Sequence, residues 1–269
     1  MKKRFRVFLC IVLLIFLPLL IWAISENKAL ELNKIAIESD RIPEAFDGFT
    51  IAHVSDLHNA EMGEKNEDLL TMLRESKPDM IAMTGDLLDS RDTDPKVALD
   101  FCAEAVKIAP VYYVTGNHEA RFDADFYKSV MQELRDIGVR VMQDEEEILT
   151  RDGESISIVG HQWGDTDQIG QLTDFDGYKI LLSHHPEAID DYAAGGYDLV
   201  LSGHAHGGQF RLPWIGGVIA PGQGLFPKYT SGLYQVENTQ LVVSRGIGNS
   251  LFPLRFNNPP EVILVTLVS

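Results

Sequence analysis

The sequence predicts an α/β fold, a sandwich of two β-sheets with helices on the outside. Two observations support this class. Short apolar runs alternate with amphipathic helical patterns in the first half of the 269-residue chain, and runs typical of strands dominate after residue 139. The length of the chain also fits one domain, because a single hydrophobic core usually supports a domain of about this size and leaves only a short N-terminal segment over. We therefore expect a single α/β domain with an N-terminal appendage.

The individual elements follow from local patterns. Helices are expected over residues 64–76, 94–110 and 123–137, where apolar residues recur at helical spacing and Pro or Gly ends each segment. Residues 33–38 alternate like an edge strand, and Pro43 follows shortly after them. The other expected strands are 50–54, 80–84, 111–115, 140–142, 156–160, 179–183, 199–202, 232–236, 240–243 and 262–268. No internal repeat interrupts this order.

Five of these strands end in residues that bind metals. The motifs, in chain order, are Asp56-x-His58, Gly85-Asp86, Gly116-Asn117-His118-Glu119, His184 and Gly203-His204-Ala205-His206. One Asp-x-His pair alone is usually a hydrogen-bonded turn, but five strands that each end in an oxygen or nitrogen ligand indicate one shared site, because open α/β sheets hold ligands at their carboxyl ends. We expect the chain to stay extended through Asp56 and His58, which would place both side chains on one side.

This set of side chains favours particular metals. Imidazoles mixed with carboxylates and one amide suit manganese, iron or zinc better than magnesium, which prefers oxygen ligands. The motifs therefore predict a site for such a metal ion at the carboxyl ends of these strands.

The ordered motifs resemble the calcineurin-like metallophosphoesterase superfamily over roughly residues 30 to 269, which implies a two-sheet αββα sandwich. The segments Gly207-Gly208-Gln209, Ser244-Arg245-Gly246 and Leu254-Arg255-Phe256-Asn257 resemble its membrane-anchored bacterial branch. That branch includes a manganese-dependent cell-surface phosphoesterase and enzymes that split the pyrophosphate of UDP-diacylglucosamine. The resemblance implies two divalent metal ions, with manganese first and iron or zinc as alternatives.

The resemblance also implies a role for each site residue. One metal would be held by Asp56, His58 and His206, and the other by Asn117, His184 and His204, with Asp86 bridging both. His118 would protonate the leaving oxygen or stabilise phosphoryl charge. Asp89 would orient His118, as an aspartate at this position does in phosphoprotein phosphatases. Those enzymes have arginine directly after it, whereas Ser90-Arg91 follows here, which argues against protein-phosphatase activity. Purple acid phosphatases carry tyrosine at the position of Asp89, so no iron-tyrosinate centre is expected.

The N-terminus predicts a membrane anchor. Lys2, Lys3, Arg4 and Arg6 precede the uncharged residues 7–24, a run about as long as a membrane span, with its basic flank in the cytoplasm. We expect a signal anchor over 1–28, a linker with an edge strand over 29–48, and an extracytoplasmic phosphoesterase domain over 49–269, in a single-pass protein of the cell membrane. A signal peptide cleaved near Ala23-Ile24-Ser25 and a buried core helix are the alternatives.

Charge and composition limit the partners. The net charge of −17 argues against nucleic acid held by a basic patch. Cys10 and Cys102 are too few for a disulfide framework. Residues 210–234 are rich in glycine, proline and aromatics, and they predict either a packed surface loop or a lipid- or substrate-facing wall of the site.

The expected function is metal-dependent hydrolysis of a phosphoester or pyrophosphate bond, with a membrane-associated lipid or lipid-linked nucleotide as substrate. A cell-wall or extracellular nucleotide phosphodiesterase is the alternative enzyme. A non-catalytic binding domain is disfavoured, because no expected ligand is missing. The sequence leaves the natural substrate, the metals and the oligomeric state open.

Overall fold

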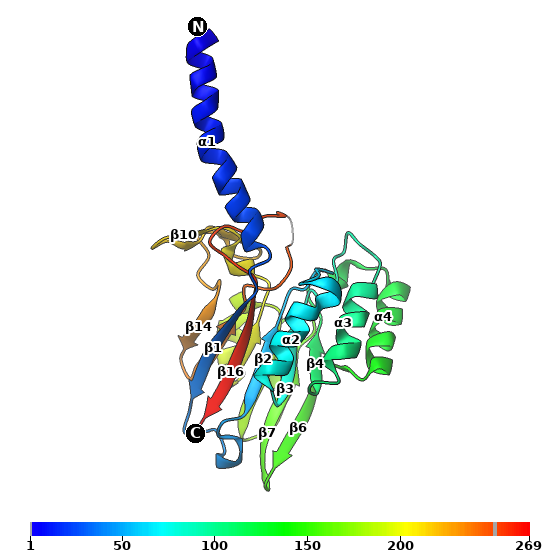
Figure 1. The fold of residues 1–269 in the computed structure, drawn as a ribbon. Helices are drawn as coiled ribbons and strands as arrows, with labels where there is room; N and C mark the ends of the chain where they lie inside the picture. Colours follow the sequence, from blue (N-terminus) through cyan, green and yellow to red (C-terminus); the bar gives the residue numbers. More distant parts are fainter. Residues whose placement is uncertain (1, 250–251) are drawn as a thin grey trace.

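The computed structural model describes residues 2–249 and 252–269, with the backbone alone for residues 2–4, 6–13 and 15. Two six-stranded sheets face one another (Figure 1). In spatial order the first sheet consists of β1 (Glu31–Glu38), β16 (Glu261–Val268), β2 (Thr50–Val54), β3 (Met80–Thr84), β4 (Val111–Val114) and β5 (Arg140–Val141). The second consists of β14 (Gly232–Val236), β15 (Thr239–Val243), β9 (Leu199–Ser202), β8 (Tyr178–Leu182), β7 (Glu154–Gly160) and β6 (Glu145–Arg151).

Most neighbouring strands are parallel. In the first sheet only the β16–β2 pair is antiparallel. In the second sheet the edge strands β14 and β6 are antiparallel to their neighbours. β1 pairs along its whole length with β16, from Glu31 beside Glu261 to Glu38 beside Val268. The expected edge strand over 33–38 is therefore present, and it is completed by the last strand of the chain.

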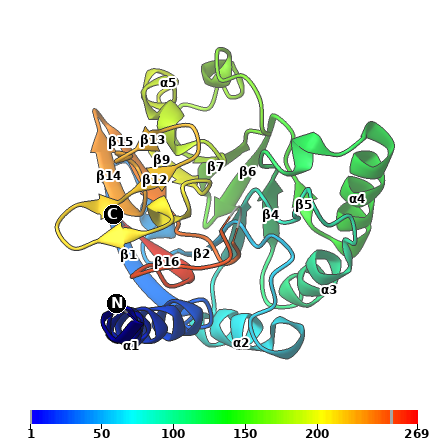
Figure 2. The same ribbon diagram turned by 90° about the horizontal axis from the view of Figure 1, so that it is seen from above.

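Helices cover the outer face of the first sheet (Figure 2). They are α2 (Glu67–Ser76), α3 (Lys96–Ala105) and α4 (Ala124–Ile137), whose apolar side chains pack in one buried cluster with β2, β3 and β4. A second cluster fills the space between the sheets. A third packs α5 (Ile189–Ala194) and part of the segment 205–229 on the outer face of the second sheet. The predicted two-sheet α/β sandwich with outer helices is confirmed.

The two ends of α4 agree with their sequence signals. In α4 the side chain of Asp123 accepts hydrogen bonds from the main-chain N–H groups of Asp125 and Phe126, at 3.2 and 3.0 Å. Gly138, with φ of 107°, ends this helix in the left-handed conformation that glycine adopts without strain. The first turn expected for α2 is instead a short 3₁₀ segment, Glu64–Asn66.

Several short elements differ from the sequence prediction. Strand β6 was not predicted, because Glu145-Glu146-Glu147 gives it a polar start. The segment 210–234, expected as a loop, contains two small hairpins. They consist of β10 (Arg211–Leu212) with β11 (Gly216–Gly217), and β12 (Ile219–Ala220) with β13 (Gly224–Leu225). Two-residue strands are too short to produce a period in the sequence.

Helix α1 (Lys2–Glu26) projects away from the sandwich (Figure 1). In the part of the chain that the structure describes, no helix combines the length and apolar character needed to cross a membrane. The side chains of residues 7–13 and 15, which belong to the expected span, lie outside the described residues. The carboxyl end of α1 is fixed to the segment 253–258, since Asn27 Nδ2 donates to the carbonyl of Pro253 at 2.6 Å and the Trp22 and Phe256 ring centroids are 4.6 Å apart.

Candidate metal centre

Strands from both sheets supply the residues of the candidate site. β2, β3 and β4 of the first sheet and β8 and β9 of the second each lead directly into one of the predicted motifs. These carboxyl ends meet at one end of the sandwich, so the structure brings together Asp56, His58, Asp86, Asn117, His184, His204 and His206. The position is the one that open α/β sheets use for ligands.

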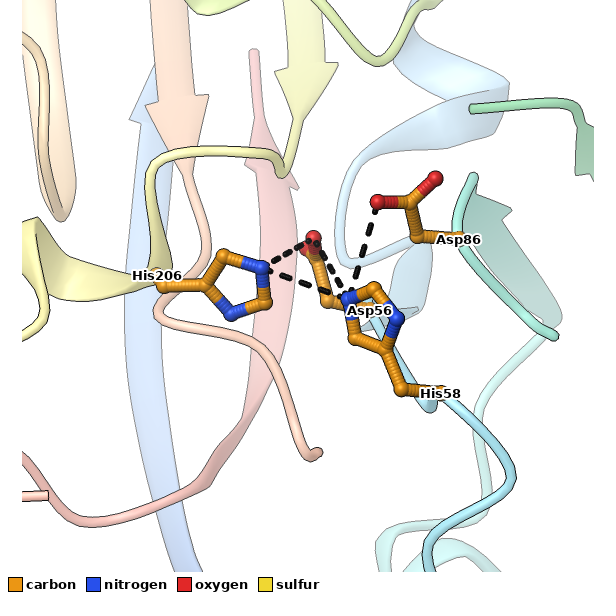
Figure 3. Close-up of side chains that lie close together, drawn as sticks. All are labelled: Asp56, His58, Asp86 and His206. Carbon is orange, nitrogen blue, oxygen red and sulfur yellow. Dashed lines mark hydrogen bonds and ion pairs between the residues drawn. The ribbon is translucent and has the colours of Figure 1, made fainter. Parts of the chain in front are cut away.

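Four buried residues form the first cluster, with potential ligand atoms all within 4.8 Å of one another: Asp56, His58, Asp86 and His206 (Figure 3). His206 Nε2 lies 3.3 Å from Asp56 Oδ1 and 3.3 Å from His58 Nε2. His58 Nε2 lies 3.6 Å from Asp86 Oδ2. The ring nitrogens and carboxylate oxygens thus point to one common volume.

Asp86 also belongs to a second cluster, together with His184 and His204. The same oxygen, Asp86 Oδ2, lies 3.3 Å from His184 Nε2. His184 Nε2 lies 3.2 Å from His204 Nδ1. One carboxylate oxygen therefore stands between the imidazoles of both clusters, where a bridging ligand would lie.

The Asn117 amide tests whether a cation fits the second cluster. Its carbonyl oxygen faces His204 Nδ1 and Asp86 Oδ2; with the amide rotated, its amino group would donate to these two atoms at 2.8 and 3.3 Å and its oxygen would accept from Arg121 Nη2 at 3.3 Å. In the unrotated orientation three atoms with acceptor lone pairs face one another. A cation between them satisfies all three at once, and amide, imidazole and carboxylate are ligands that borderline divalent metals accept. The residues present fit a metal.

Burial and charge set the protonation of these groups. Burial lowers the pKa of His58 to about 4 and that of His204 to about 3. Burial also acts to lower the pKa of His184, but the charges of Asp86 and Asp56 outweigh it and raise the pKa to about 10. Without a metal, His184 is therefore held protonated between the two carboxylates, whereas His58 and His204 are neutral, the form in which imidazole binds metals. A cation in the second cluster would take the place of the His184 proton.

The backbone at the candidate ligands is strained. Left-handed φ angles occur at five of the seven predicted metal ligands: Asp56, His58, Asp86, His204 and His206. Such angles cost of order 1–3 kcal/mol each in residues other than glycine, and they gather at functional sites. They also correct the sequence argument. β2 ends at Val54, so Asp56 and His58 converge through left-handed turns and not through strand alternation.

His118 lies beside the first cluster, with its ring centroid 4.5 Å from that of His58. The main-chain N–H of Ser90 donates to His118 Nδ1 at 3.0 Å. Because a backbone N–H can only donate, Nδ1 is the unprotonated nitrogen, and the proton of the neutral ring resides on Nε2. Asp89 Oδ1 lies 3.4 Å from Nδ1, while the Asp89 carboxylate accepts from Arg91 Nε at 2.9 Å. The main chain at Ser90 is thus the group that fixes the His118 tautomer.

Glu119 joins two of the loops that carry candidate ligands, a role that the sequence did not reveal. This fully buried carboxylate accepts hydrogen bonds from the main-chain N–H groups of Asp86 at 3.0 Å, Leu88 at 2.9 Å and Gly116 at 2.8 Å. Two of its partners, Asp86 and Leu88, follow β3 in the chain and become neighbours of Glu119 only when β3 and β4 pair, so no local signal could have identified them.

Arg255 holds another loop of the centre. Its buried guanidinium donates to the carbonyls of Arg245 and Gly248, at 2.9 and 2.5 Å. Gly248 in turn donates its N–H to the carbonyl of Asp56 at 2.7 Å. Arg255 therefore supports the loop behind Asp56.

The comparison with known families decides the relationship of this chain. A sequence model of the family described as calcineurin-like phosphoesterase matches residues 49–208, which is more than half of the chain. The chain belongs to the calcineurin-like phosphoesterases. The family depends on two metal ions, and the buried Asp/His clusters could bind them. The protein is accordingly a metal-dependent phosphoric ester hydrolase.

Relatives of this calcineurin-like phosphoesterase share most of its length. It is 34% identical to the uncharacterised metallophosphoesterase YkuE of Bacillus subtilis, over 91% of this chain and 87% of the relative. It is 26% identical to the phosphodiesterase YaeI of Escherichia coli, over 82% of each chain. The crystal structure of phosphopantetheinyl hydrolase from Mycobacterium tuberculosis is similar in fold, with a TM-score of 0.50 and 12% identity, over 75% of this chain and 91% of that one.

Proposed function

We propose that this phosphoesterase hydrolyses a phosphodiester or pyrophosphate bond at a centre of two divalent ions. One observation carries the proposal. Asp86 Oδ2 lies 3.6 Å from His58 Nε2 and 3.3 Å from His184 Nε2, so one oxygen faces the imidazoles of two separate clusters. A structural ion pair needs only one such partner, whereas a bridge between two cations needs both.

The assignment of ligands follows the two clusters. Asp56, His58 and His206 would hold the first ion, and Asn117, His184 and His204 the second, with Asp86 shared. The donor set favours manganese, with iron or zinc as alternatives. When bound, such ions neutralise charge on phosphoryl oxygens and lower the pKa of a water molecule.

His118 would donate a hydrogen bond to the reacting phosphate. The Ser90 N–H keeps Nδ1 free of a proton, so the neutral ring presents Nε2–H, which would stabilise negative charge that develops on the leaving oxygen or on a phosphoryl oxygen. The main-chain N–H of His118 donates to Asp86 Oδ1 at 2.8 Å, which fixes the distance between this donor and the shared carboxylate. Asp89, with its charge balanced by Arg91, would adjust the electrostatics around His118.

We further propose that α1 attaches the phosphoesterase domain to a membrane, on its extracytoplasmic side. The support is the uncharged run over 7–24 behind a basic flank, and the exposure of its described apolar side chains, among them Leu14 and Phe16. Membrane fractions washed with alkaline carbonate should retain the full chain and release a chain that lacks residues 2–26. Release of both would contradict the anchor.

The enzymatic proposal is tested with bis(4-nitrophenyl) phosphate. Protein reconstituted with Mn²⁺, Fe²⁺ or Zn²⁺ should release 4-nitrophenol, and elemental analysis should give two ions per chain. Asp86→Asn should lose metal and turnover together, because it removes the shared charge. Asp174→Asn serves as a matched control, since Asp174 is exposed and lies in a loop outside the centre.

The same assay addresses the alternatives. A non-catalytic binding domain would show no turnover with any metal, or turnover that Asp86→Asn leaves intact. A panel of nucleotides, phospholipids and lipid-linked nucleotides then separates an extracellular nucleotide phosphodiesterase from an enzyme for lipid substrates, since only the former would prefer the soluble nucleotides.

A further inference from the structure

An apolar cavity of about 410 Å³ adjoins the metal centre. His206 of the first cluster lines it, together with Gln209, Ile219, Ala220, Pro221 and Phe252. Among the described residues that line it, none carries a carboxylate, an ammonium or a guanidinium group. A charged or strongly polar substrate group would lose its hydration there without compensation.

The cavity wall is fixed to the centre and is not a loose loop. The buried Gln209 donates through Nε2 to the carbonyls of Phe252 and Leu254, at 3.3 and 3.0 Å. Val218, at the start of the second hairpin, donates its N–H to the carbonyl of Gly208 at 3.0 Å. Two hairpins and the segment after residue 251 are thus held against the loop that carries His206.

The same surface is apolar beyond the cavity. The hairpins present exposed side chains of Trp214, Ile215, Leu225 and Phe226. The hairpins and the carboxyl end of α1 lie at one end of the molecule (Figure 1). An apolar surface of this kind, next to a catalytic site, is typical of a binding site.

We propose that this cavity binds the hydrocarbon chain of a phosphoester substrate, which rests on the phosphoesterase function proposed above. His206 belongs to both the cavity and the first cluster, so a phosphate at the centre and an alkyl or acyl chain on one of its oxygens would occupy adjoining spaces. The substrate class is therefore a phosphodiester with one apolar arm. The cavity stabilises that arm through burial of its methylene groups.

Two chromogenic substrates test whether the cavity binds the alkyl chain of a substrate. They are methyl 4-nitrophenyl phosphate and hexyl 4-nitrophenyl phosphate, used below the concentration at which micelles form. Both release 4-nitrophenol, so the ratio of their kcat/KM values reports the binding of five additional methylene groups. If about half of the surface of the hexyl chain is buried, we expect the hexyl ester to have a kcat/KM about 30 times that of the methyl ester. This ratio corresponds to ~2 kcal/mol of additional transition-state stabilisation. Ile219→Asn should bring the ratio to within about threefold of one.

The control is Ile148→Asn. Ile148 is 43% exposed on β6 and Ile219 is 40% exposed on β12, but only Ile219 lines the cavity. The control variant should keep the wild-type ratio. Titration calorimetry of hexylphosphonate and methylphosphonate, which the enzyme cannot hydrolyse, against metal-loaded protein gives a readout that does not depend on turnover. Hexylphosphonate should bind more tightly to the wild type, and Ile219→Asn should remove this preference.

Each outcome has one meaning. Turnover of both esters with a ratio near one would overturn the chain site and leave the phosphoesterase function intact. A high ratio that Ile219→Asn does not reduce would mean that the alkyl chain binds outside the cavity, which would also overturn the proposal. Absence of turnover of either ester with every metal would instead refute the function itself. If a second copy of the chain filled the cavity, the ratio would stay near one and rates would depend on protein concentration.

Discussion

Glu119→Gln changes one atom of the carboxylate that accepts three main-chain hydrogen bonds. Glu119 Oε2 accepts from Asp86 and Gly116, and Oε1 accepts from Leu88. A glutamine can keep its carbonyl oxygen on the first two N–H groups. Its amino group then faces the N–H of Leu88, so two donors meet in a buried site.

The expected destabilisation follows from these contacts. A buried donor left without an acceptor costs ~1–3 kcal/mol. The charge of Glu119 adds no net stability, because burial raises the pKa of this carboxyl group and its ionised form therefore opposes folding. We expect the free energy of unfolding to fall by about 1–3 kcal/mol, which for a domain somewhat larger than 200 residues corresponds to a fall in Tm of roughly 2–9 °C.

Urea unfolding and calorimetry of metal-free protein, at about pH 8, measure the effect without a contribution from bound metal. Burial, together with the charge of Asp86, raises the pKa of Glu119 to about 7, so the carboxyl group is mainly ionised at that pH. Glu145→Gln, an exposed position on β6, should leave the unfolding free energy within about 0.5 kcal/mol. If Glu119→Gln also changed the unfolding free energy by no more than about 0.5 kcal/mol, the role of Glu119 in joining the loops after β3 and β4 would be refuted.

Three other variants or reagents probe separate parts of the structure. His118→Ala should keep near-normal metal content while turnover falls ~10²-fold or more, the usual scale for loss of a donor to developing charge; loss of metal in elemental analysis would show that His118 is a ligand. Arg255→Met should lower the unfolding free energy by about 3–5 kcal/mol in urea, since it strands buried carbonyls, whereas Arg151→Met on the surface should have little effect. Cys102 should resist iodoacetamide in native protein at about pH 8, because burial raises the pKa of its thiol to about 12 and only the thiolate reacts. Mass spectrometry of the Cys102 peptide would contradict this if native and denatured samples were labelled equally.

Strand positions and the approximate place of the centre were accessible from the sequence. The apolar runs before Asp56, Asp86 and His184 are buried strands with a local signal, and parallel strands bring their carboxyl ends to one edge. The second sheet could be predicted only in part, because the acidic residues at the start of β6 give no strand pattern. Parallel pairing in that sheet had no signal of its own.

The fine geometry of the centre could not be read in the same way. A left-handed φ at Asp56 or His206 is unfavourable locally and is imposed by the surrounding fold, so residue type does not reveal it. The roles of Glu119 and of the Ser90 amide likewise depend on loops that come together through β-sheet pairing. The orienting role of Asp89 stays a prediction, since its Oδ1 lies 3.4 Å from His118 Nδ1 while its carboxylate also pairs with Arg91, two residues along the same loop.

The position of β16 has a consequence for biosynthesis. Its residues leave the ribosome after those of every other strand, yet they lie between β1 and β2, which are made among the first. Until residue 268 has emerged, the nascent polypeptide exposes two unpaired edges that could recruit other chains. A premature stop codon after residue 243 would leave the second sheet whole and the first one divided, and such products should be degraded by proteases.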